Sequence, residues 1–418
     1  MDEEREMVLR MLKEGKISVE EADALLQELA DQSKEAPEGG REEGRAASRP
    51  GEDLEGVDVR VELRRVLKEL TESIPREVMD EIRRTREVFR PTFVEVLRGL
   101  RGLTEGRAET TAEEAMRPGE TLDLRHAWGD VRISAADEGP MRLRAVKRVW
   151  ALTAEEARRE AEALPVEVRR DGSSVVVHVP RPAGRRARVD FEITVPRGVG
   201  ARIDVAKGDL SLDRVAGAEL HVARGDVRVA GLEGALRADV VSGDLEIRRV
   251  EGDVRVDIKS GDVAASDIRG RVEGRILNGD VAIQESRGAA LDLVNGDVDL
   301  RRVAGPVAVT TKSGDVRLVH SRSTEVNVRT LAGEVEIDLE ELVQGAVVVE
   351  TISGDITLAV PADSRATIDA STRSGSVSVG LPLTEQTAGV RSLRGVLNGP
   401  GATVRLLATS GDVVVRGR

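Results

Sequence analysis

A Gly-Asp dipeptide that returns every 17 or 18 residues is the feature that most restricts how this chain can fold. Glycines halfway between these dipeptides, such as Gly252 and Gly270, show that the underlying unit has about nine residues and that each coil contains two units. Fixed short periods of this kind are typical of solenoid proteins. The residues of this turn ladder are Gly208, Asp209, Gly225, Asp226, Gly243, Asp244, Gly261, Asp262, Gly279, Asp280, Gly296, Asp297, Gly314, Asp315, Gly354 and Asp355.

Between the turns, apolar residues alternate with polar ones, as in Val254 and Val256 or Val281 and Ile283. A period of two places one face of each strand inward and the other outward. One nine-residue unit cannot bury its inner face, whereas stacked coils share a continuous aliphatic interior. We therefore predict a mainly β chain with a parallel β-solenoid over residues 201–418, built from coils of about 18 residues with two strands and two turns each.

The spacing of the recurring glycine distinguishes between two kinds of solenoid. Eighteen residues per coil also suits a left-handed helix of three hexapeptides, in which every sixth residue is distinctive. In this sequence glycine recurs at every ninth position, which favours a flat, two-sided solenoid. Roughly ten coils with a strand spacing of about 4.8 Å would form a rod on the order of 50 Å long. Because aromatic residues make up 1% of the chain, we expect an interior of Val, Ile, Leu and Ala.

Four further segments precede the predicted solenoid. We expect a helical hairpin at 1–32, an acidic solvated linker at 33–56 and amphipathic helices at 57–107. Residues 108–200 read as a β lead-in and cap with one inserted helix at 153–164, which Thr153 caps and Pro165 ends.

The segment 57–107 contains a candidate partner or membrane helix, in which an apolar stripe lies beside a basic one. Packing against the solenoid's end or another subunit would explain the stripe, and so would attraction to an anionic membrane surface. Its residues are Arg83, Arg86, Phe89, Arg90, Phe93 and Leu97.

Several function classes are disfavoured. The chain has no cysteine, its four histidines occur singly, and its net charge of −13 argues against nucleic-acid binding. We find no nucleotide-binding or catalytic motif and expect no cofactor and no enzyme activity. Local turn chemistry explains the Gly-Asp ladder. A calcium-binding β-roll is an alternative, weakened because the second turn lacks the acid, as in Gly270-Arg271.

Two groups of residues resemble a known family. Residues 11–22 (MLKEGKISVEEA) resemble a short SHOCT-like helical domain, and the Ser-Gly-Asp-Val repeats, with Val189–Pro196 (VDFEITVP) leading in and Ser410–Val413 closing, resemble the repeats that follow it. The chain is thus similar to the bacterial putative-adhesin β-repeat family of cell-envelope stress proteins, of the LiaX and YvlB type. The resemblance implies a non-enzymatic role in sensing or binding at a stressed envelope.

These observations predict a binding or scaffold protein that meets a protein partner, or a second copy, through its N-terminal helices, with possible peripheral contact to an anionic membrane. A self-assembling structural solenoid is the alternative, since uncapped strand edges invite pairing. The acidic N-terminus and the lack of an apolar run of membrane-spanning length predict a cytoplasmic protein. The family resemblance implies membrane association or surface display instead.

Overall fold

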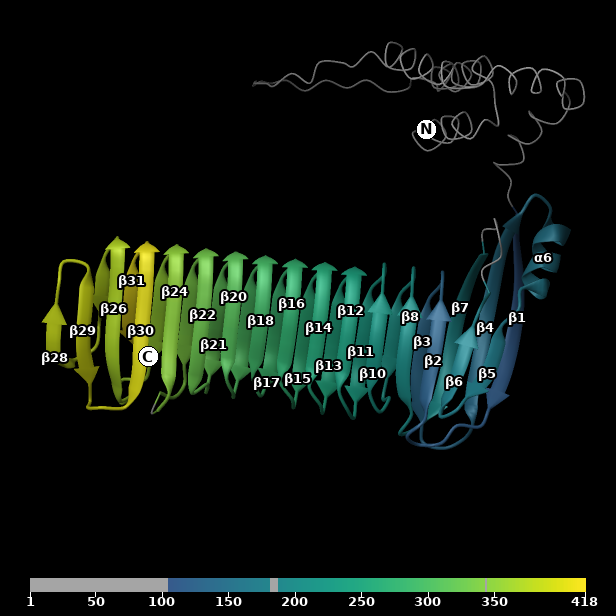
Figure 1. The fold of residues 1–418 in the computed structure, drawn as a ribbon, viewed down its shortest axis with the longest axis horizontal. Helices are drawn as coiled ribbons and strands as arrows, with labels where there is room; N and C mark the ends of the chain where they lie inside the picture. Colours follow the sequence, from purple (N-terminus) through teal and green to yellow (C-terminus); the bar gives the residue numbers. More distant parts are fainter. Residues whose placement is uncertain (1–103, 181–186, 343) are drawn as a thin grey trace, which may run out of the picture. The chain divides into compact units, whose positions relative to one another are not determined.

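The computed structural model describes residues 104–418 except 181–186 and 343. All of these belong to one compact unit, Gly99–Arg418. Within the described residues the chain forms 31 strands and one helix, α6 (Ala154–Ala163), and the strands make two long sheets (Figure 1). The segments expected at 1–32 and 33–56, and all of 57–107 except its last four residues, lie outside the described residues.

Sheet A has 15 strands. In spatial order they are β1 (Thr104–Glu114), β4 (Met141–Ala151), β7 (Ala187–Pro196), β3 (Val131–Ala136), β9 (Leu210–Asp213), β11 (Val227–Leu232), β13 (Leu245–Val250), β15 (Val263–Ile268), β17 (Val281–Ser286), β19 (Val298–Val303), β21 (Val316–Ser321), β23 (Val335–Leu339), β25 (Ile356–Val360), β31 (Val413–Gly417) and β27 (Val377–Val379).

Sheet B has 16 strands. In spatial order they are β28 (Leu383–Ala388), β29 (Ser392–Leu397), β26 (Ala366–Ser374), β30 (Ala402–Ser410), β24 (Ala346–Ser353), β22 (Glu325–Ala332), β20 (Val307–Ser313), β18 (Ala289–Asn295), β16 (Val272–Asn278), β14 (Val254–Ser260), β12 (Leu236–Ser242), β10 (Ala218–Val222), β8 (Gly200–Val205), β2 (Thr121–His126), β6 (Ser174–His178) and β5 (Glu167–Asp171).

The two sheets are the two faces of a solenoid, because each coil contributes one strand to sheet B and the next strand to sheet A. Neighbouring coils pair in parallel at the spacing of the repeat, so that Leu245 of β13 lies opposite Val263 of β15. The predicted fold class is confirmed. The interior is aliphatic, since Val254, Val256 and Ile258 of β14 are at most 2% exposed and belong to one core cluster that runs through both sheets.

A residue with a left-handed backbone turns the chain at or next to the end of each sheet A strand from β9 to β21. Arg249 has a φ of 55°, and the equivalent residues of neighbouring coils, Asp267 and Glu285, have 55° and 65°. This conformation costs a non-glycine residue about 1–2 kcal/mol. It breaks the alternation, so that Ile247 and Val250 both face the core. This corner was not predicted from the sequence.

The Gly-Asp turns need glycine for two reasons. Gly243 has a φ of 141°, a region that other residues rarely adopt. A Cβ atom at this position would also overlap the carbonyl group of Gly225 in the preceding coil. The turns of successive coils are therefore stacked backbone on backbone.

Excursions of the chain cover both ends of the solenoid. We expected a domain boundary between residues 200 and 201. Neither sheet is interrupted there, because β2 pairs with β8 and β3 pairs with β9. Between β3 and β8 the chain forms β4, α6, β5, β6 and β7, all outside the coil made by β2 and β3. At the other end, β30 lies between β24 and β26, and β31 lies between β25 and β27. The last coil in sequence is thus not the last in space.

The helix α6 packs on β1 and β4 at the N-terminal end of the sheets. Thr153 is its N-cap and accepts a hydrogen bond from the N–H of Glu156 at 3.2 Å. Lys147 closes the other end, where its Nζ donates to the carbonyl oxygen of Leu164 at 2.9 Å. Burial lowers the pKa of Lys147. The carbonyl oxygen of Leu164 and the negative end of the helix dipole stabilise the charged ammonium group there.

Candidate interaction surfaces of the solenoid

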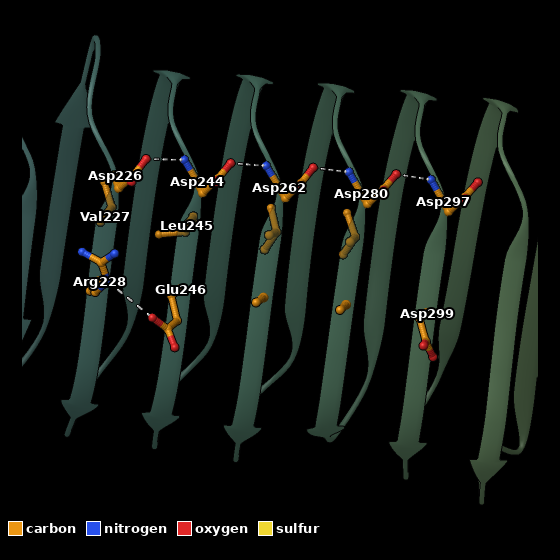
Figure 2. Close-up of a pocket in the computed structure, with 14 residues that line it drawn as sticks. Asp226, Val227, Arg228, Asp244, Leu245, Glu246, Asp262, Asp280, Asp297 and Asp299 are labelled. Atoms are coloured by element: carbon orange, nitrogen blue, oxygen red, sulfur yellow. Dashed lines mark hydrogen bonds and ion pairs between the residues drawn. The ribbon is translucent and has the colours of Figure 1, made fainter. Parts of the chain in front are cut away.

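The predicted Gly-Asp residues form a column along one edge of the solenoid, which we call the aspartate ladder. In each step the backbone N–H of one acidic residue donates to Oδ1 of the equivalent residue in the preceding coil (Figure 2). Asp262 donates to Asp244 at 3.0 Å, and Asp280 donates to Asp262 at 2.8 Å. The side chains therefore connect coils, whereas local turn chemistry would have kept their bonds within one turn.

The ladder is longer than the predicted set. Its unbroken part runs from Asp130 to Glu334, with donor–acceptor distances of 2.7–3.2 Å. A separate part links Asp412 to Asp355 at 2.7 Å. The dipeptide Gly129-Asp130 is the sequence signal for the extension. Asp190, which accepts from the N–H of Asp130 at 2.9 Å, has no glycine before it and no such signal.

Asp190 and Asp130 belong to a charged cluster at the N-terminal end of the ladder. Arg188 donates to it at 2.8 Å and to Asp130 at 2.5 Å, and Arg148 lies 3.4 Å away. Burial raises the pKa of Asp190, but the N–H of Asp130 and the two arginines outweigh that effect, so the pKa lies below its ordinary value. The carboxylate is thus stabilised in its charged form.

The described aromatic residues gather at this same end. Trp128 and Trp150 stack with ring centroids 5.8 Å apart, and Lys207 Nζ lies 5.2 Å from the Trp128 ring centre. His126 is buried and meets Phe191 edge to face at 5.0 Å. The alternation of Leu122, Leu124 and His126 along β2 is the signal that places this histidine inward.

Burial lowers the pKa of His126 to about 4, although backbone groups of Trp128 and Val189 and the carboxylates of Asp190 and Asp130 act in the opposite direction. Neither ring nitrogen forms a hydrogen bond with any described residue. The imidazole is therefore neutral at physiological pH and acts as part of the core.

The outer face of sheet A carries a shallow groove beside the aspartate ladder (Figure 2). Its floor is made by the small outward residues Ala264 and Ala282, and Glu246 and Asp299 flank them. Arg301 holds Asp299 at 2.5 Å, and Arg228 lies 3.6 Å from Glu246. The groove has a volume of about 500 Å³ and is lined by turn aspartates of the ladder and by residues of the adjoining strands.

Metal and membrane features can be judged only for the described part of the chain. There, no three His, Cys, Asp or Glu side chains converge in a way that could hold a metal ion. The helix α6 is too short and too polar to span a membrane, and no other helix is found among those residues. The candidate helix residues Arg83, Arg86, Phe89, Arg90, Phe93 and Leu97 lie outside the described residues.

Comparisons with solved structures give distant similarities. A "putative cell adhesion protein" from Clostridium sporogenes is 10% identical, with 75% of this chain and 100% of that chain covered and a TM-score of 0.18. A "putative adhesin" from Bacteroides fragilis is 12% identical (74% and 97% covered, TM-score 0.26). A "putative lipid binding protein" from Parabacteroides distasonis is 8% identical (74% and 96% covered, TM-score 0.29). These similarities are too distant to support an argument about residues or ligands.

Comparison with protein families is more specific, while no curated protein matches the chain. Residues 279–416 match the family described as Toastrack DUF4097, and residues 3–34 match a SHOCT-like domain. Both matches agree with the resemblance seen in the sequence, which they confirm. The chain thus carries a Toastrack domain in its solenoid and a SHOCT-like domain at its N-terminus.

Proposed function

We propose that this protein is a non-enzymatic binding or scaffold protein that acts at a stressed bacterial cell envelope, with the flat faces of the solenoid as its contact surfaces. The observation that carries the proposal is the regularity of those faces. Neighbouring coils pair in the same register, so equivalent outward side chains line up along both faces of the solenoid.

Ion pairs link neighbouring coils on the outer faces of the solenoid. On sheet B, Arg202 lies 2.7 Å from Glu219, and Arg255 lies 2.7 Å from Glu273. Such exposed pairs contribute about 0–1 kcal/mol each to stability. Their regular spacing is better suited to recognition of an extended partner, for which alternating charges supply specificity and register.

The match of residues 279–416 to the Toastrack family supports the non-enzymatic part of this proposal. We extend this to a protein partner or a second copy engaged through the N-terminal helices, and to peripheral contact with an anionic membrane. Sensing of envelope stress is the part of the proposal that rests on the resemblance alone.

Photo-crosslinking in the native host tests the proposal. A photoreactive residue is placed at Gln284 on the outer face of sheet A, at Arg275 on the outer face of sheet B, and at Glu156 of α6 as a control away from both faces. We expect a discrete adduct from one face in the envelope fraction of stressed cells, and none from Glu156. If neither face gives an adduct and the protein stays in the cytosolic fraction under stress, the proposal is wrong.

The alternative of end-to-end filaments is tested by electron microscopy. Antiparallel strands cover both ends of the solenoid, and the edge strand β27 of sheet A has only three residues. Short or charged edge strands oppose pairing with another chain. We therefore expect particles of uniform length at all protein concentrations, and concentration-dependent filaments would favour the alternative.

A further inference from the structure

Four exposed apolar side chains occupy the same position in different coils. Val241, Leu277, Leu331 and Ile352 are 45–52% exposed, and each lies two residues before a turn glycine. The other large apolar side chains that are exposed in the described part of the chain, Leu152 and Val390, lie outside the repeat. Scattered exposed apolar residues are ordinary, whereas a set that recurs at one position of a repeat is a surface feature.

Strand pairing aligns these residues into one row. The register of sheet B places seven residues side by side, one in each of seven consecutive strands from β12 to β24. Six strand spacings of about 4.8 Å give the row a length of about 29 Å. In spatial order the row is Val241, Lys259, Leu277, Val294, Lys312, Leu331 and Ile352, which we call the edge stripe.

The edge stripe lies directly beside the aspartate ladder, because each ladder residue follows its stripe residue by three positions. Asp262, Asp280 and Asp315 of the ladder are exposed. Carboxylates in this place would repel an anionic lipid surface. The best match for the stripe and the adjoining carboxylates is a partner surface that offers both apolar contacts and accessible cations.

A second copy of the chain offers such a surface. If two stripes meet in antiparallel orientation about a two-fold axis through Val294, Val241 faces Ile352, Lys259 faces Leu331, and Leu277 faces Lys312. No lysine then faces a lysine, and each lysine stem can pack on a leucine. The ammonium group of Lys312 comes level with Asp280 of the other copy, and that of Lys259 comes level with Glu334.

We propose that the edge stripe is a self-complementary interface through which two copies of this chain associate side by side and antiparallel. The stripe alone, about 29 Å by 12 Å, offers on the order of 350 Å² per copy, less than the ~800 Å² of a standard interface. The flanking turn residues must contribute the remainder. The dimer is therefore weak, with dissociation in the micromolar range, and it does not depend on the envelope partner proposed above.

Sedimentation of the full-length protein tests the interface. Wild type goes from monomer to dimer as its concentration rises through the micromolar range. Val241→Asp combined with Ile352→Asp places a carboxylate opposite a carboxylate in the antiparallel pair and weakens dimerisation at least tenfold, whereas Leu152→Asp, at a site that is 55% exposed but off the stripe, leaves it unchanged. Circular dichroism shows that each variant is folded. A dimer that persists in the double variant lies elsewhere and overturns the proposal.

Single cysteines test the orientation, because the chain has none of its own. Val294→Cys lies on the two-fold axis, so a short bismaleimide reagent links two copies through it. Val241→Cys lies about 29 Å from its equivalent in an antiparallel pair and is not linked. Equal linking of both variants, or of neither, contradicts the arrangement. If wild type stays monomeric and instead binds anionic vesicles through the stripe, the occupant is a membrane and the proposal falls.

Discussion

Protonation of His126 is coupled to folding of the N-terminal end. Its pKa is about 4 in the folded chain and about 6.5 when unfolded, so the unfolded state takes up the proton first as the pH falls. The stability contributed by the neutral ring is complete above pH 6.5 and is lost as the pH falls toward 4.

We therefore expect the free energy of unfolding of this end to fall by about 2 kcal/mol between pH 7 and pH 5. Trp128 and Trp150 are the two tryptophans of the chain, so their fluorescence in urea reports on this region. In His126→Leu the same interval gives a much smaller fall. Parallel pH profiles for wild type and variant would show that other groups cause the change.

Asp262 is a residue-scale test of the aspartate ladder. Asp262→Ala removes the acceptor for the N–H of Asp280, and we expect a loss of about 1 kcal/mol in urea denaturation. Asp262→Asn keeps an oxygen at Oδ1 and changes stability little, because neutral and charged acceptors both satisfy this donor. If Asn costs as much as Ala, the charge itself is required, and binding of a cation such as calcium becomes the better explanation.

The Gly-Asp turn is the element at which backbone stacking leaves no room for a side chain. Gly243→Ala meets both a φ of 141° and the carbonyl group of Gly225, and we expect it to cost at least 3 kcal/mol. Gly172→Ala is the matched control. Its φ is 57°, its Cβ would meet open space, and we expect about 1 kcal/mol. Similar melting temperatures for the two variants would contradict the close approach of the coils.

Elements that depend on the period of the sequence could be predicted, and elements that depend on distant partners could not. The spacing of Gly-Asp and the alternation of Val254 and Val256 determine turns and strands locally, so the two-sided solenoid follows from them. The left-handed corner at Arg249 has a weaker signal, two polar residues in a row before Val250. The burial of His126 also follows from alternation once the strand is known.

The candidate surfaces, too, could be predicted from the sequence only in part. The turn residues of the ladder were visible in the sequence, but their bonds reach the next coil, which only the strand register reveals. The edge stripe was not identified, because Val241 and Leu277 look like ordinary members of an apolar run until their exposure is known. No local pattern places β30 between β24 and β26.

At the scale of the whole solenoid, that placement of β30 makes the C-terminal cap depend on the last coil. Strands β26, β28 and β29 reach the rest of sheet B only through β30, which pairs with β24 on its other side. In a solenoid, stability is close to a sum over neighbouring coils. Loss of the coil β30–β31 should therefore release the cap and leave distant coils folded.

Val404→Asp tests this dependence, since Val404 is fully buried in β30 and an unpaired carboxylate there cannot be accommodated. We expect hydrogen exchange to become fast in β26 to β31, while β8 to β20 keep their wild-type protection. Ile258→Asp in the middle of the solenoid, where burial is similar, should instead expose the coils around β14 and leave the cap protected. Uniform loss of protection in both variants would mean that the solenoid unfolds as one cooperative unit, and that its ends are not independent of its middle.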